Sequence, residues 1–235
     1  MQRLHLPRTV PAGIEVWLLK FDFHSTQLIN DWSLLSMDEQ VRTQRFHQHE
    51  DRVRSIATRA ALRRLLAECV MSSPHDIQIE LDKFGKPRLP ASYGVEFNVS
   101  HAGDFALIAL STRGEIGIDI EYRHRDVSNL CIHVLSPVER ARRVWSNKNF
   151  IDLWVVKESV LKALGFGIAE YLQAITVLPD HGGSYHVMHD QTEWAEVKAW
   201  SIDAPIHYVA ALALTKHRKL EVERHPFLSC FSKCA

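Results

Sequence analysis

Gly117-Ile118-Asp119-Ile120-Glu121 is the stretch that decides how this chain is organised, and Trp154-Val155-Val156-Lys157-Glu158-Ser159-Val160-Leu161-Lys162 completes it. In the first stretch isoleucines alternate with Gly117, Asp119 and Glu121, which predicts a strand with both acids on one face. In the second, apolar residues recur at helical spacing, and Glu158 and Lys162 stand four residues apart on a neighbouring face. The strand thus carries two charged side chains on one of its faces, and the helix carries two on one of its own.

Three carboxylates in these stretches, those of Asp119, Glu121 and Glu158, form a candidate site for a hard divalent cation. Mg²⁺ prefers oxygen ligands and usually binds a few carboxylates together with waters and substrate phosphates. Gathered carboxylates repel one another unless positive charge lies nearby, and Lys157 and Lys162 supply such charge. In the simpler alternative, the strand acids form a solvated face and Glu158 and Lys162 form an ordinary exposed helix pair.

Two further motifs suit the same site. Phe97-Asn98-Val99-Ser100-His101 alternates as a strand and ends on a polar Ser-His pair, where ligand-binding groups commonly lie. Phe84-Gly85-Lys86-Pro87 follows another alternating run, and its glycine allows a tight loop whose backbone approaches a flat ligand closely. A Gly-Lys-Pro turn also serves as a plain hairpin connection, and this alternative stays open.

With these four segments in this order, the chain resembles a 4′-phosphopantetheinyl transferase of the surfactin-synthetase-activating type. The resemblance rests on FGKP at 84–87, FNVSH at 97–101, GIDIE at 117–121 and WVVKESVLKALGFG at 154–167. It also covers Arg45-Phe46 and Glu50-Asp51, which lead into the helix that carries Arg54. GIDIE or KES alone would be a weak match, whereas the combination is specific.

The resemblance implies a role for each matching residue. Asp119, Glu121 and Glu158 would hold Mg²⁺, with Mn²⁺ as an alternative, on the diphosphate of coenzyme A, which is the co-substrate. Lys157 and Lys162 would contact the phosphates. The residues implied to bind the 3′-phosphate are Arg54, Ser100 and His101, and those implied to form the adenine loop are Gly85, Lys86 and Pro87.

The reaction implied is attack by a serine hydroxyl of an apo acyl or peptidyl carrier protein on the β-phosphorus of coenzyme A, which releases 3′,5′-ADP. The catalytic residues would be Glu158, Lys162 and Asp119. Glu158 is the candidate general base, although a metal-bound carboxylate with an ordinary pKa of about 4.3 accepts a proton poorly unless an ordered water relays it. The ligand role of Glu158 is therefore the firmer expectation.

The resemblance also implies an α+β fold of two similar lobes in a pseudo-twofold arrangement. Each lobe is a small, mostly antiparallel sheet packed by helices, and the cofactor lies in the cleft between the lobes. The sequence adds a hint of duplication, because Phe105–Ser111 and Val209–Thr215 read alike. We expect an N-terminal lobe over 1–113, a C-terminal lobe over 114–216 and a polar tail over 217–235.

A coarse reading of periodicity and helix signals predicts the individual elements. Helices are expected over 38–46, 51–71, 136–146 and 149–164, the third opened by Ser136-Pro137 and Glu139 and the last stopped by Gly165. Strands are expected over 15–21, 77–81, 95–99, 105–111, 116–121, 173–178, 184–188, 195–201 and 207–215.

Composition sets the protein class. The chain has 235 residues, with 28 lysines and arginines balanced by 28 aspartates and glutamates. This balance gives no reason to expect nucleic acid or a membrane surface as a partner. The first residues lack the apolar core of a signal peptide, and no stretch approaches a membrane span, so we expect a cytoplasmic protein. Two lobes in one chain make a monomer sufficient.

Two other functions remain open from the sequence. The same acids would serve a metal-dependent phosphohydrolase or nuclease, although no Asp…Glu-x-Lys nuclease pattern surrounds Glu121. A non-catalytic interpretation treats the arginine-rich helix over 51–71 as a binding surface for an acidic partner.

Overall fold

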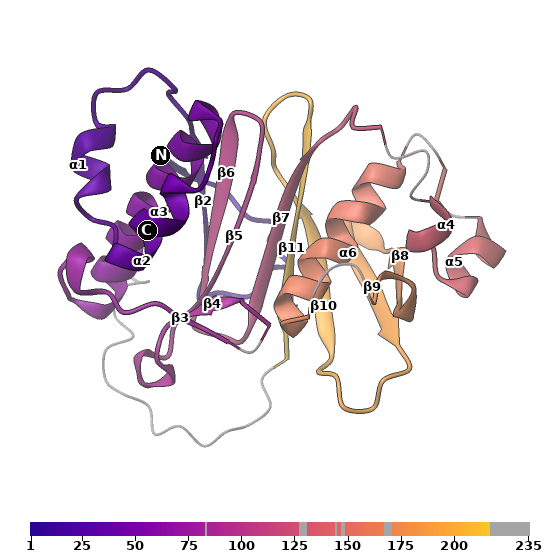
Figure 1. Ribbon diagram of the computed structural model, residues 1–235. Helices are drawn as coiled ribbons and strands as arrows, with labels where there is room; N and C mark the ends of the chain where they lie inside the picture. Colours follow the sequence, from indigo (N-terminus) through magenta and orange to yellow (C-terminus); the bar gives the residue numbers. More distant parts are fainter. Residues whose placement is uncertain (83, 127–130, 144, 147–148, 167–170, 217–235) are drawn as a thin grey trace.

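The computed structural model describes residues 1–82, 84–126, 131–143, 145–146, 149–166 and 171–216. It consists of two lobes, each an antiparallel sheet with a long helix on its outer face (Figure 1). The α+β fold of two helix-packed lobes expected from the sequence is confirmed. The expected tail over 217–235 lies outside the described residues.

The first lobe contains a four-stranded sheet in the order β1-β2-β6-β5 and the long helix α3. A separate two-stranded ribbon, β3-β4, carries the loop expected to meet a flat ligand. The α2 helix begins with a capping box in which Ser36 and Glu39 satisfy each other's backbone N–H groups. The bounds in this lobe are β1 Gln2–Arg3, β2 Ile14–Lys20, α1 Leu28–Trp32, α2 Met37–Gln44, α3 His49–Val70, β3 Glu80–Leu81, β4 Pro87–Arg88, β5 Glu96–Ala102 and β6 Phe105–Ser111.

The second lobe contains a five-stranded sheet in the order β7-β11-β10-β9-β8, and the helix α6 covers it. The expected capping box at Ser136 and Glu139 opens α5, and α6 ends at Gly165, whose φ of 79° suits a glycine. The bounds in this lobe are β7 Ile116–Tyr122, α4 Cys131–Val134, α5 Pro137–Arg142, α6 Phe150–Leu164, β8 Ile175–Pro179, β9 Ser184–His189, β10 Val197–Ile202 and β11 Tyr208–Thr215.

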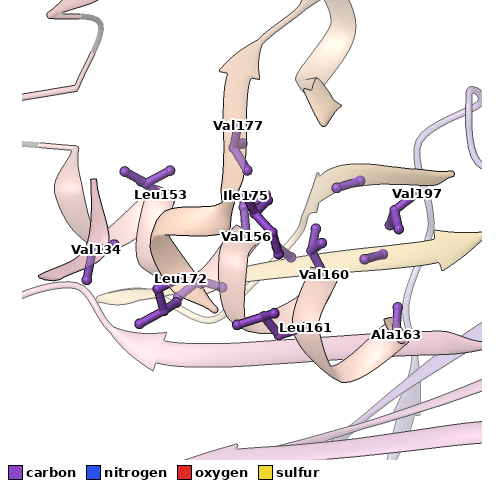
Figure 2. Close-up of a cluster of buried hydrophobic side chains, with 14 of the residues drawn as sticks. Val134, Leu153, Val156, Val160, Leu161, Ala163, Leu172, Ile175, Val177 and Val197 are labelled. Atoms are coloured by element: carbon purple, nitrogen blue, oxygen red, sulfur yellow. The ribbon is translucent and has the colours of Figure 1, made fainter. Parts of the chain in front are cut away.

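The apolar stripe of α6 anchors it to its sheet. Val156 and Val160 of the helix are at most 1% exposed and belong to one cluster with Ile175 of β8 and Val197 of β10. Figure 2 shows these side chains gathered between the helix and the strands. Fully burying a side chain of this kind contributes about 1.5–3 kcal/mol. This packing fixes the position of the charged residues that α6 carries.

The lobes meet through the inner faces of their sheets and along the neighbouring strands β5 and β7. Isoleucines 116, 118 and 120 of β7 pack in one cluster with Val16 of β2 and Leu107 of β6. Where β5 approaches β7, Asn98 Oδ1 accepts a hydrogen bond from the Ile118 backbone N–H at 3.0 Å. Side chains therefore join the two sheets where no backbone ladder does.

The observed elements differ from the predicted ones in a few places. The strand expected over 77–81 is only Glu80–Leu81, because the Ile77 carbonyl accepts a hydrogen bond from Arg63 instead of a neighbouring strand. The strand expected to end at Val99 continues to Ala102, so Ser100 and His101 lie within it. No helix in the described part of the chain is long and apolar enough to cross a membrane.

Candidate active site

A cavity of about 360 Å³ lies where β5, β7 and α6 converge, and we call it the central pocket. Asp119 and Glu121 of β7 both line it, which confirms that the alternation places the two acids on one face. Glu158 and Lys162 line it from α6, one helical turn apart. The complete lining is Val99, Ser100, His101, Asp119, Ile120, Glu121, Arg125, Trp154, Glu158 and Lys162.

The central pocket depends on an unusually close approach between β7 and α6. A Cβ atom on Gly117 would lie 1.9 Å from the Ser159 carbonyl oxygen and 2.5 Å from the Ala163 backbone nitrogen. The space can therefore hold only a hydrogen atom, and glycine alone allows the contact. Gly117 brings Asp119, two residues along the same strand face, to the helix that carries Glu158 and Lys162.

Lys162 joins the three elements at the pocket floor. Its Nζ donates hydrogen bonds to Asp119 Oδ1 at 2.6 Å, to Ser100 Oγ at 3.2 Å and to the Ile118 carbonyl at 3.2 Å. Ser100 Oγ in turn donates to Asp119 Oδ1 at 2.7 Å. Asp119 is thus a nearly buried carboxylate that accepts two close hydrogen bonds, one of them from an ammonium group.

Glu158 has a different environment. It is 6% exposed, and the residues that the structure describes give its carboxyl group no hydrogen bond or ion pair. Burial, followed by the neighbouring charge of Asp119, raises the pKa of Glu158 to about 7, against the opposing influence of Lys162 and Arg125. The pocket therefore contains a carboxyl group whose negative charge is not balanced by the nearby cations.

Glu121 is already occupied by partners in the protein. Its Oε1 accepts a hydrogen bond from the Tyr122 backbone N–H at 2.8 Å, and its Oε2 forms an ion pair with Arg125. The Arg125 guanidinium carbon also lies 5.7 Å from the centre of the Trp154 ring. Sequence reasoning missed Arg125, and its spacing of four residues from Glu121 in a loop offers no recognisable motif.

His101 lines the same pocket beside Arg54. Although His101 remains an exposed residue, partial burial of its ring, and then the charges of Arg54 and Lys162, lower its pKa below 6.5. The Arg54 side chain is fixed by hydrogen bonds to the Gly103 carbonyl and to Asp51, each 2.8 Å long, and it lies over the Phe23 ring. The structure therefore brings Arg54 and His101 together, although Arg54 does not line the pocket.

The loop with Gly85, Lys86 and Pro87 lies at the far end of α6 and outside the lining of the central pocket. The Lys86 Nζ donates to Glu115 Oε2 at 2.9 Å and to the Lys162 carbonyl, at the helix end, at 2.8 Å. These contacts tie the ribbon of the first lobe to the second lobe. They leave the backbone of the loop, and not the lysine ammonium, as the part that can face a ligand.

Lys157 is not brought together with the other expected site residues. Its Nζ is fully buried, 2.7 Å from Glu139 Oε2, and it donates to the carbonyls of Val134 and Leu172. Burial lowers the pKa of Lys157 to about 8, against the opposing charge of Glu139. This lysine, expected to contact phosphates, faces the side of α6 away from the pocket and fastens the helix to α5 and its neighbours.

The carboxylate oxygens of the central pocket are of the kind that binds a hard cation, but their present arrangement is not that of a formed metal site. Within the described residues, no three His, Cys, Asp or Glu side chains are grouped so as to hold a metal ion. Asp119 and Glu121 are each engaged by a protein cation, whereas Glu158 has no ion-pair partner in the described part of the chain. All three offer oxygen atoms to one cavity, as Mg²⁺ requires, so the ion would replace the contacts of Lys162 and Arg125.

A second cavity, also of about 360 Å³, lies between the lobes near Arg88, Glu115 and Trp194. Arg88 is already paired with Asp82 and Glu115, and the lining contains none of the site residues expected from the sequence. The expected site residues, and a buried carboxyl group without an ion-pair partner in the described part of the chain, mark the central pocket, and not this cavity, as the candidate active site.

Comparisons with known proteins show the family to which the chain belongs. Residues 22–113 match the family model described as "4′-phosphopantetheinyl transferase, N-terminal". Residues 115–213 match the model of the 4′-phosphopantetheinyl transferase superfamily.

Individual relatives match across most of both chains. The chain is 34% identical over 167 residues to the 4′-phosphopantetheinyl transferase HetI of Nostoc, covering 67% of this chain and 70% of that protein. It is 25% identical over 177 residues to the 4′-phosphopantetheinyl transferase Sfp of Bacillus subtilis, covering 73% and 79%. It is 26% identical over 214 residues to the human L-aminoadipate-semialdehyde dehydrogenase-phosphopantetheinyl transferase, covering 80% and 68%.

Proposed function

The chain belongs to the 4′-phosphopantetheinyl transferase superfamily, and we propose from this premise how its central pocket transfers phosphopantetheine from coenzyme A to an apo carrier protein. One observation carries the proposal. Three carboxylates, Lys162, Ser100 and His101 share one pocket at the junction of the lobes, and one of the carboxylates lacks a counter-charge among the described residues. Such a pocket suits a cation that arrives together with a diphosphate.

In this proposal Asp119, Glu121 and Glu158 hold Mg²⁺, and Mn²⁺ serves as an alternative. The ion, when bound, withdraws electrons from the phosphorus and neutralises charge on the departing diphosphate oxygen. Lys162 donates to the same departing oxygen without losing its proton. Its ammonium already lies 2.6 Å from Asp119.

The rest of the nucleotide is held by residues from the first lobe. Arg54 and His101, which are neighbours, bind the 3′-phosphate, and Ser100 lies beside them in the lining of the pocket. The backbone of Gly85, Lys86 and Pro87 packs on the adenine. Gly85 has a φ of 81°, so a residue with a side chain would strain this loop.

The transfer itself is one displacement at phosphorus. The serine oxygen of the carrier forms a bond to the β-phosphorus, the bond from that phosphorus to the bridging oxygen breaks, and 3′,5′-ADP leaves. The serine proton passes to Glu158, directly or through one water. The pKa of about 7 belongs to the metal-free pocket, and a bound cation lowers it, so an ordered water would be the better relay for the proton.

One chain supplies every residue of the pocket, and we therefore propose that the protein acts as a monomer on acyl or peptidyl carrier domains. We propose the cytoplasm as the place of this reaction. Neither nucleic acid nor a membrane has a part in this proposal. Lys157 has no contact with the cofactor in it, because its ammonium is buried against Glu139.

Intact-mass spectrometry of an apo carrier protein tests the proposal. The carrier should gain one phosphopantetheine group when it is incubated with the chain, coenzyme A and Mg²⁺, and EDTA should prevent the gain. Asp119→Asn should abolish the reaction. The matched control is Asp152→Asn, since Asp152 lies on the same helix as Glu158 but pairs with Arg123 outside the pocket.

The same assay separates transfer from hydrolysis. If coenzyme A is cleaved to free phosphopantetheine at the same rate without any carrier, the pocket is that of a phosphohydrolase. If Asp119→Asn and Asp152→Asn modify the carrier equally well, the central pocket is not the active site.

A further inference from the structure

Arg125 is a charged residue of the central pocket to which the proposed reaction gives no part. It follows β7 and lines the cavity, and its guanidinium forms an ion pair with Glu121 Oε2. The guanidinium also lies over the ring of Trp154, with 5.7 Å from its carbon to the ring centre. The Arg125 side chain is 46% exposed, so it has room to move.

The ion pair with Arg125 competes with a metal ion for the Glu121 carboxylate. The Glu121 Oε1 accepts the Tyr122 N–H, and Oε2 faces Arg125. The backbone bond can remain when a metal binds, because a carboxylate oxygen has more than one lone pair. The ion pair cannot remain, because the guanidinium and the divalent cation are both positive and would repel each other at the same oxygen.

A cation that enters the pocket alone therefore meets two obstacles. It must displace Arg125 from Glu121, and it must lie near both Arg125 and Lys162 without added negative charge. A cation that enters with a diphosphate also displaces Arg125, but both obstacles are then smaller. The phosphate oxygens supply negative charge, and they give the displaced guanidinium a new acceptor with two oxygens that its planar group can bind together.

We propose that Arg125 is a positioning residue that occupies Glu121 in the free protein and makes binding of the divalent cation depend on the diphosphate of coenzyme A. This inference rests on the proposed metal site of Asp119, Glu121 and Glu158. Trp154 keeps the Arg125 guanidinium at the pocket while the guanidinium moves from Glu121 to the diphosphate. The free protein thereby disfavours the metal until the co-substrate arrives.

Arg123 provides the matched control. Its side chain is 45% exposed, and it also pairs with a single carboxylate, that of Asp152, at 3.4 Å. It lies two residues from Arg125 but does not line the pocket. Replacing either arginine removes the same charge from the same segment, whereas only one replacement frees a proposed metal ligand.

A titration of the full chain with Mn²⁺ tests the inference. Binding is monitored by electron paramagnetic resonance, and no carrier protein is present. In the wild type, coenzyme A should tighten Mn²⁺ binding by about tenfold or more. In Arg125→Gln, Mn²⁺ alone should bind about fivefold or more tightly than to the wild type, and the effect of coenzyme A should shrink by a similar factor. Arg123→Gln should behave like the wild type in both measurements.

Binding of coenzyme A supplies a check that is independent of the metal signal. Thermodynamic reciprocity requires Mn²⁺ to tighten coenzyme A binding by the factor by which coenzyme A tightens Mn²⁺ binding. Calorimetry with and without Mn²⁺ should therefore show a smaller factor in Arg125→Gln than in Arg123→Gln.

Two results would overturn the inference in different ways. If Arg125→Gln binds Mn²⁺ as weakly as the wild type and keeps the full effect of coenzyme A, Arg125 does not restrain the metal, and the proposed metal site can still hold. If Asp119→Asn and Glu121→Gln bind Mn²⁺ as the wild type does, with and without coenzyme A, the metal site itself is wrong and the inference fails with it.

Discussion

The Asp119 carboxylate and the Lys162 ammonium lie 2.6 Å apart, although 43 residues separate them along the chain. Asp119 comes from β7 and Lys162 from α6, and the lysine also donates to Ser100 of β5. One ion pair thus connects the strand, the helix and the opposite lobe at the floor of the central pocket. Loss of this ion pair should lower both the rate of carrier modification and the free energy of unfolding, so we expect its substitution to be informative.

Lys162→Met should reduce carrier modification by at least about 100-fold, since a donor to the departing oxygen is lost. It should also lower the free energy of unfolding, because the nearly buried Asp119 loses its cationic partner. Steady-state kinetics and urea unfolding measure the two effects. Lys198→Met, at an exposed position of β10, should change neither. Turnover at the wild-type rate in Lys162→Met would contradict the role of this lysine.

Glu158→Gln should stabilise the metal-free protein above pH 7. The pKa of Glu158 is raised from 4.5 to about 7, so between these values the folded state binds more protons than the unfolded state, and stability falls as pH rises. Removing the charge should restore up to roughly 3 kcal/mol above pH 7 and nothing below pH 4.5. Urea unfolding in EDTA across this range measures the difference.

The exposed Glu80 provides the control for that experiment, because Glu80→Gln should leave the pH dependence of unfolding unchanged. If the stability difference between wild type and Glu158→Gln is the same at both ends of the pH range, the carboxyl group of Glu158 does not have a raised pKa.

Lys157→Met should destabilise the protein by about 3–5 kcal/mol, since it leaves the buried Glu139 carboxylate without its cation. The double variant Lys157→Met with Glu139→Gln should recover much of this loss, because no unpaired charge remains. Thermal and urea unfolding of the three proteins compare the effects. A Lys157→Met protein of normal stability with a raised KM for coenzyme A would show instead that the lysine contacts the cofactor.

Gly117→Ala should impair fold and activity together. The new methyl group would overlap the Ser159 carbonyl oxygen, so α6 must shift away from β7. Overpacking of this kind costs about 1–3 kcal/mol, and the shift would separate Asp119 from Lys162. Urea unfolding and carrier modification should both decline. Normal stability in the Gly117→Ala variant would mean that the helix does not approach the strand this closely.

Much of this arrangement could be predicted from local patterns. The alternation in Ile116–Tyr122 and the helical spacing of Glu158 and Lys162 each specify a face, and packing of the apolar residues then brings the two faces together. The caps at Ser136 and Gly165 were likewise readable, because they depend on neighbours within a few residues.

The features that sequence reasoning missed depend on contacts between distant segments. Lys157 adjoins Glu158, yet their side chains leave the helix about 100° apart, and only the position of Glu139 in the fold decides that one is buried in an ion pair. Lys86 lies in a recognisable loop, but its ammonium is bound by Glu115 and the end of α6. The partner of Arg125 is likewise fixed by the path of the chain after β7.

The most direct test of the central claim is the position of a bound metal. We would measure anomalous diffraction from crystals of the chain grown with coenzyme A and Mn²⁺. We expect a single strong peak within coordination distance of Asp119, Glu121 and Glu158, adjoining the diphosphate of the bound nucleotide. A peak elsewhere, or a nucleotide ordered outside the central pocket, would contradict it.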